Sequence, residues 1–219
     1  GCVFSRSSGI QAWFHIQLSG ATIESISVVP GTTFDQLYLA VNRGGVRGLE
    51  RLGEVYGTEG HLDAAATVTM ATRTVTALWL KSTTATVVYN GIAYPVVLDA
   101  NGIGTVPAGP PNNSNVLIGA GFTGTLTTMP SQAKSVLGPA NMRPQVVTNI
   151  TARLLLSYPM KVSSGGGTAE TANFIGPQTG DFPIPVSGRW DTEGTISIIQ
   201  DAPFDVTVLA VSIELDAGG

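Results

Sequence analysis

Apolar and polar residues alternate in short runs along most of this chain. In the run Phe204–Leu215 the alternation has a period of two, which is typical of a strand with one buried face. The two predicted faces contain Leu209, Val211, Ile213 and Leu215 on one side and Val208, Ala210, Ser212 and Glu214 on the other. Asp201-Ala202-Pro203 separates this run from Thr195–Gln200, and proline favours a turn there. We therefore predict a strand–turn–strand unit at the C-terminal end.

Further short strands are predicted over the rest of the sequence. They are Cys2–Phe4, Ala12–Leu18, Thr22–Val29, Val75–Leu80, Thr84–Tyr89, Ala93–Leu98, Ile103–Val106, Val116–Ile118, Thr123–Thr128 and Val146–Leu156. The runs Phe34–Val41 and Val46–Leu52 fit both a strand and a helix face, and Gly44-Gly45 between them favours a hairpin. Asn90-Gly91 and Asn101-Gly102 are typical of hairpin turns, because a type I′ turn needs positive φ at both central residues.

The composition favours many short strands and turns over helices. Of 219 residues, 43% are hydrophobic and 12% are charged, and the chain has 27 Gly and 13 Pro. We predict a short helical turn only at Ser131–Leu137 and a flexible loop at Ser163–Thr168. The sequence therefore predicts an all-β protein of several small antiparallel units with very little helix. The predicted divisions are residues 1–57, 58–128 and 129–219, of which the second is a small β-sandwich-like domain.

Charge and cysteine content exclude some classes of protein. With 11 Lys+Arg and 15 Asp+Glu the net charge is −4, which argues against a tight nucleic-acid grip, since that needs clustered basic residues. A weakly acidic surface would suit a channel that DNA slides through. Cys2 is the single cysteine, so no disulfide can form within the chain. No run is long and apolar enough to span a bilayer. Because the chain begins at Gly1 in mid-pattern, we interpret it as a piece of a longer protein.

One glycine-rich motif matches a cofactor-binding pattern, but we favour a structural role for it. Gly119–Gly124 reads GAGFTG, which matches the glycine pattern of dinucleotide-binding loops. Thr125–Thr128 is a poor helix start, however, and Pro130 would end a helix there. We interpret the motif as a glycine-rich connection between strands.

Titratable residues also lack a convincing catalytic or metal-binding pattern. His15 and His61 have no second histidine or cysteine nearby, so a zinc site is not predicted. Asp191, Glu193 and Asp201 could pair as glycosidase carboxylates, but beside glycine and proline they are typical turn residues. We therefore predict no catalytic, cofactor-binding or metal-binding residues, and a protein that is not an enzyme.

Several segments, taken in order, resemble one family. Gly188-Arg189-Trp190-Asp191 and then Gln200-Asp201-Ala202-Pro203, each followed by a β run, resemble the pattern GGWD…QDxPLP…PE. This pattern recurs at the C-terminal end of the tail nozzle (tail tubular or tail stabilisation) proteins of short-tailed bacteriophages. His61-Leu62-Asp63-Ala64 is similar to a Phe-Leu-Asp-Ser segment that opens a domain in that family. Asp35–Arg43 and Leu49–Leu52 are similar to a family strand pair, although the turn here is shorter.

The resemblance implies a structural component of the virion. The family forms a ring, usually a homohexamer, beneath portal and adaptor proteins, encloses a channel for DNA ejection and holds tail fibres outside. Residues 1–57 would then be the closing strands of a truncated propeller-like N-terminal region. DNA would pass transiently and without sequence specificity, and no cofactor is expected.

Two other classes of function remain open from the sequence. A secreted β-sandwich module that binds carbohydrate would use exposed coplanar aromatic residues, for which Trp13, Trp79 and Trp190 are the candidates. Tryptophan in a β-rich chain is more often a core or interface residue. A β-rich hydrolase domain would need a cleft with convergent acidic and basic groups.

Overall fold

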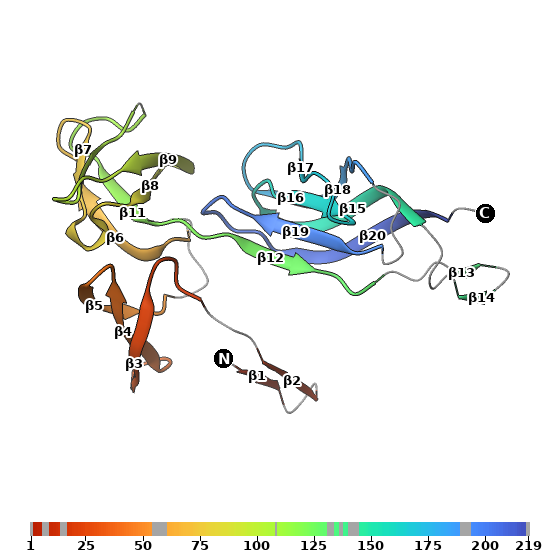
Figure 1. Ribbon diagram of the computed structural model, residues 1–219, viewed down its shortest axis with the longest axis horizontal. Helices are drawn as coiled ribbons and strands as arrows, with labels where there is room; N and C mark the ends of the chain where they lie inside the picture. Colours follow the sequence, from red (N-terminus) through yellow and green to blue (C-terminus); the bar gives the residue numbers. More distant parts are fainter. Residues whose placement is uncertain are drawn as a thin grey trace.

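The structure confirms the predicted all-β class. The computed structural model describes residues 2–5, 9–13, 17–53, 61–107, 109–130, 134–135, 138–139, 145–188 and 194–217. Most of the described residues lie in strands, and the one helical element among them is a three-residue 3₁₀ turn, η1 (Leu78–Leu80). Several small antiparallel sheets follow one another, and Figure 1 shows them as separate groups of arrows.

The N-terminal part consists of a hairpin and a three-stranded sheet. The hairpin pairs β1 (Cys2–Ser5) with β2 (Ile10–Trp13). The sheet, which we call the N-terminal unit, has the order β3-β4-β5 and contains β3 (Thr22–Val29), β4 (Gln36–Arg43) and β5 (Val46–Arg51). The runs Phe34–Val41 and Val46–Leu52, which fitted both a strand and a helix, therefore form strands joined by the Gly44-Gly45 turn. The small core of the N-terminal unit contains Leu18, Leu39 and Val41.

The middle unit is a sandwich of two sheets. Its strands are β6 (Asp63–Thr69), β7 (Thr74–Thr76), β8 (Thr84–Tyr89), β9 (Ile92–Val97), β10 (Ile103–Thr105) and β11 (Asn115–Ala120). One sheet has the order β6-β11-β8-β9 and the other pairs β10 with β7. Fully buried Val87, Val75 and Ile118 belong to the core between them. The Asn90-Gly91 turn has φ of 48° and 72°, as the predicted type I′ hairpin requires.

Two local predictions in the middle unit are wrong. The predicted strand Val75–Leu80 is divided, because the chain leaves β7 and turns through η1 with the Leu80 amide bonded to the Ala77 carbonyl. Asn101-Gly102 does not join paired strands, since β10 pairs with β7 and not with β9. The Asp99 carboxylate instead accepts the amides of Asn101 and Ile103 and holds this turn.

The C-terminal unit is a second sandwich. Its strands are β12 (Gly124–Thr127), β15 (Gln145–Ser157), β16 (Lys161–Ser164), β17 (Glu170–Thr171), β18 (Gln178–Ile184), β19 (Ile196–Gln200) and β20 (Val208–Ala217). The sheets have the orders β12-β19-β16-β17 and β18-β15-β20, with buried Leu154, Ile184 and Ile198 in the core. Since β12 pairs with β19, strand pairing assigns β12 to this unit, whereas the predicted division at residue 128 placed it in the preceding one.

The C-terminal strands correct the opening prediction in two ways. β19 and β20 follow each other along the chain as predicted, but they lie in opposite sheets and do not pair. The alternation in β20 is also broken, because Arg153 pairs with Ala210 while Leu154 pairs with Val208. The extra residue, Leu209, forms a β-bulge and points outward, so Val208 takes the half-buried position instead.

Two further segments differ from their predictions. Within the predicted helical turn Ser131–Leu137, Lys134–Ser135 forms β13, which pairs with β14 (Gly138–Pro139). The predicted loop Ser163–Thr168 begins inside β16, where Ser163 and Ser164 are buried. In the described residues no helix is long and apolar enough to cross a membrane.

Candidate functional site

One polar site joins the middle unit to the C-terminal unit. His61 directly precedes Leu62 and β6, and Asp205 lies in the loop between β19 and β20, 144 positions away. The His61 amide donates a hydrogen bond to the Pro203 carbonyl at 2.8 Å, and the ring Nε2 contacts the Asp205 carboxylate. The two side chains are 28% and 40% exposed, so the contact is partly screened by water. We call this site the junction.

The loop that receives His61 is held by its own contacts. Tyr158 stacks on Phe204 with ring centroids 4.6 Å apart, and the Tyr158 amide donates to the Asp205 carbonyl at 2.8 Å. The Gln200 amide group donates to the carbonyl of Phe204, and Pro203 is buried. These contacts hold the backbone of the loop that carries the Asp205 carboxylate.

A second polar connection links the middle unit to the N-terminal unit. The Ser19 amide donates to the Asp63 carboxylate at 2.6 Å. The guanidinium of Arg43, whose side chain is 8% exposed, donates to the Ser19 carbonyl and pairs with Glu50 at 2.8 Å. A buried charge is tolerated when it is paired and its donors are satisfied, and Arg43 meets both conditions. The segment His61–Asp63 therefore contacts both neighbouring units.

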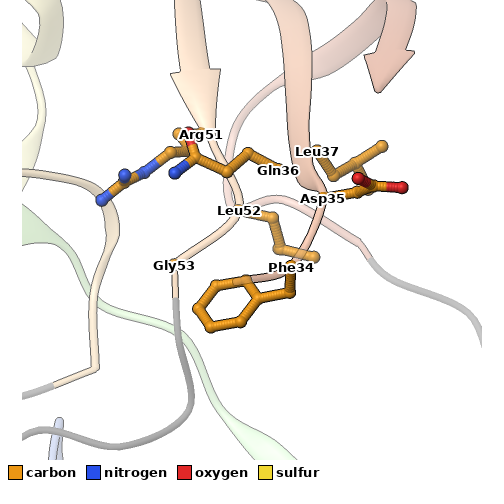
Figure 2. Close-up of a pocket in the computed structure, with 7 residues that line it drawn as sticks. All are labelled: Phe34, Asp35, Gln36, Leu37, Arg51, Leu52 and Gly53. Atoms are coloured by element: carbon orange, nitrogen blue, oxygen red, sulfur yellow. The ribbon is translucent and has the colours of Figure 1, made fainter. Parts of the chain in front are cut away.

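A shallow pocket on the N-terminal unit offers little for a ligand. It encloses about 220 Å³ and is lined by Phe34, Asp35, Gln36, Leu37, Arg51, Leu52 and Gly53. Ligand sites commonly occupy about 300–1,000 Å³ and bring a few polar groups together. Figure 2 shows the charged ends of Arg51 and Asp35 on opposite sides of the Phe34 ring, so they do not converge on one point.

The glycine motif Gly119–Gly124 connects β11 to β12 and no helix follows it. Gly119 is a close-approach position, because a Cβ there would lie 2.6 Å from the Leu62 Cβ and 2.8 Å from the Asp63 carbonyl oxygen. The motif thus lets β11 pack against the start of β6 and has no helix N-terminus for a pyrophosphate. The interpretation as a strand connection agrees with this geometry.

The other candidate residues do not come together at one site. Asp201 pairs with Lys161, whereas Asp191 and Glu193 lie outside the described residues, as does His15. Trp79 is half-buried against the middle core and donates through Nε1 to the Ala64 carbonyl at 2.8 Å. The side chains of Trp13 and Trp190 are also outside the described part of the chain. No group of three or more potential metal ligands occurs among the described residues.

Shifted carboxyl groups lie on the surface and have structural partners. A hydrogen bond from Arg153 lowers the pKa of Asp181, and one from Arg47 lowers the pKa of Glu24. The backbone amide of Ile103 is the main cause of the lowered pKa of Asp99. Each shift favours the ionised form of an exposed acid, unlike the raised pKa expected of a general acid.

Comparisons with known proteins identify no family. No protein-family model matches the chain, and no curated protein matches it.

Proposed function

We propose that the chain is a structural part of a short-tailed phage tail nozzle. In this proposal copies pack side by side into a ring, the ring encloses a channel for DNA ejection, and its outer surface is a platform for tail fibres. The observation that supports it most directly is the junction. Two segments that resemble the nozzle family, His61–Ala64 and Gln200–Pro203, meet there and serve to connect units.

The N-terminal unit supports a role in assembly. Ile26 and Val28 pair with Leu39 and Leu37 across β3 and β4, so all four side chains lie on the core face. Leu39 is buried, yet Ile26 and Val28 are 60% and 59% exposed. An apolar sheet face left half covered is typical of a surface that another protein covers.

The remaining parts of the proposal concern partners and location. A nozzle protein would contact portal and adaptor proteins on one side and tail fibres on the other, within the virion. It would act mechanically, without a cofactor and without catalysis. DNA would pass along the channel wall in weak, non-specific contact, which a chain with a net charge of −4 suits better than a basic one.

Mixing the full chain with a phage portal–adaptor complex tests this function. Negative-stain images should show added density beneath the adaptor, with rotational symmetry about the channel axis. A glycan array probed with the same sample should give no specific signal. Specific glycan binding without any portal–adaptor binding would contradict the nozzle proposal and favour the carbohydrate-binding hypothesis.

A further inference from the structure

Two outer strands of the described sheets remain open on one side. β5 is an edge of the order β3-β4-β5, and β20 is an edge of the order β18-β15-β20. They span six and ten residues, and neither contains proline. An open edge presents unpaired backbone N–H and C=O groups to any strand that can align with it. Figure 1 shows β5 in the group at one end of the molecule and β20 in the group at the other.

Most other edges in the described structure are poorly suited to pairing. β9 contains Pro95 and β18 contains Pro183, and proline removes a donor from the ladder. β17 has only two residues and β12 has four. β3 is interrupted by a bulge at Glu24.

The exposed charges on β5 and β20 are complementary. Arg47 and Arg51 flank Leu49 on the exposed side of β5, and Leu49 is 72% exposed. β20 exposes Glu214 and Asp216 on its outer face. Among the described ion pairs, Arg47 alone of these charged groups has a partner, namely Glu24. Among the residues that the structure describes, Glu214 and Asp216 on β20 therefore have no ion-pair partner, and neither has Arg51 on β5.

We propose that β5 of one copy of this chain pairs with β20 of a second copy and continues its sheet. The inference rests on the proposed ring, and it names the contact between neighbours. In an antiparallel register that places Arg47 opposite Asp216, Arg51 lies diagonal to Glu214, within reach of a long side chain. Backbone hydrogen bonds supply the affinity, and the charge pairs select the partner and the register.

This contact joins two different surfaces of the same chain. Such a heterologous contact leaves one β5 and one β20 free until a ring closes, and it builds a filament if the rotation does not close. The contact is therefore head-to-tail, and it gives the proposed ring when the rotation between neighbouring copies closes.

Charge reversal in the full chain tests the pairing. Arg51→Glu and Glu214→Arg should each raise the concentration at half-assembly at least about tenfold, measured by light scattering, because attraction becomes repulsion. The double variant R51E/E214R restores the attraction and should assemble nearly as the unmodified chain does. Lys81→Glu is the matched control, since Lys81 is exposed on the middle unit. Circular dichroism confirms that each variant is folded.

Mixed disulfides test the contact without altering a charge. In a Cys2→Ser background, copies with Gly48→Cys are mixed with copies with Leu215→Cys, because the proposed register places these two uncharged residues opposite each other. A Cβ at Gly48 meets no atom within 4 Å in the chain itself. Strands that pair place facing Cα atoms close enough for a disulfide, so a cross-link is expected between the two kinds of copy and not among Gly48→Cys copies alone.

The outcomes separate this inference from the proposed function. If rings form and the charge reversals behave as Lys81→Glu does, with no mixed disulfide, the β5–β20 contact is wrong while the nozzle proposal stands. If the unmodified chain stays monomeric at every concentration and beside the portal–adaptor complex, both are overturned. Rings that R51E and E214R each disrupt and the double variant restores support both.

Discussion

The junction predicts a specific coupling between the middle and C-terminal units. Replacing His61 by alanine removes the ring contact with Asp205 but keeps the amide bond to the Pro203 carbonyl. A partly exposed side-chain contact of this kind contributes about 0.2–1 kcal/mol, and water screens this one because its side chains are 28% and 40% exposed. Local opening at the junction should then become easier by up to about 1 kcal/mol, which corresponds to amide exchange up to about fivefold faster.

Hydrogen exchange measured by mass spectrometry is the suitable assay. His61→Ala and Asp205→Ala should each speed exchange in the peptides around residues 61–69 and 200–206. The double variant should add little to either single change, because both remove the same contact. Arg153→Ala is a matched control, since it breaks an exposed pair with Asp181 within one sheet and should leave residues 61–69 unaffected.

Two results would refute this reasoning. Strictly additive effects of the two substitutions would mean that His61 and Asp205 do not interact. Equal acceleration in Arg153→Ala would mean that any lost surface charge has the same effect, and that the junction has no special role.

Three further predictions concern the fold, each measured by the free energy of unfolding. Gly119→Val should destabilise by about 1–3 kcal/mol, because its Cβ would lie 2.6 Å from Leu62; an unchanged value would contradict the close approach. Leu154→Ala should cost about 2–5 kcal/mol, whereas Leu209→Ala, at the outward-pointing bulge, should cost less than about 0.5 kcal/mol; equal losses would contradict the bulge. The pKa of Asp99 is lower in the folded protein than in the unfolded chain, so the ionised carboxylate stabilises the fold. This contribution is lost as the pH falls below the unfolded pKa of about 4, so the free energy of unfolding should decrease below about pH 4, and less steeply in Asp99→Ala.

Local sequence signals predicted the parts of the fold that depend on local chemistry. Asn90-Gly91 and Gly44-Gly45 formed the expected hairpin turns, since positive φ is inexpensive for asparagine and glycine. Thr22–Val29 and Thr84–Tyr89 formed strands at the predicted bounds. Period-two alternation identifies a half-buried strand wherever one face meets a core.

The predictions from the sequence were wrong where the local structure depends on pairing with a strand far away in the chain. The bulge at Leu209 follows from its pairing with β15, which the alternation within β20 does not reveal. Likewise, Ile103–Thr105 pairs with Thr74–Thr76 across the sandwich, although the adjacent turn favoured a hairpin with β9. Local patterns give strands, but the partner of each strand is set by packing of the whole unit.

The junction was also beyond the reach of the sequence. The sequence places no second histidine or cysteine near His61, and its partner Asp205 is 144 positions away, within the run Phe204–Leu215 that was predicted as a strand. In the structure β20 begins only at Val208, so Asp205 lies in the preceding loop. The one available signal was the resemblance, because it singled out both segments without saying that they meet. Polar pairs between units leave no periodicity in the chain, so only a folded structure places them together.

The mass of the full chain in solution tests the central claim most directly. Light scattering over a range of protein concentrations, with negative-stain images of the same samples, should show a closed ring of several copies. A strict monomer at all concentrations, and also in the presence of the portal–adaptor complex, would contradict the proposal that this chain is part of a ring-shaped nozzle.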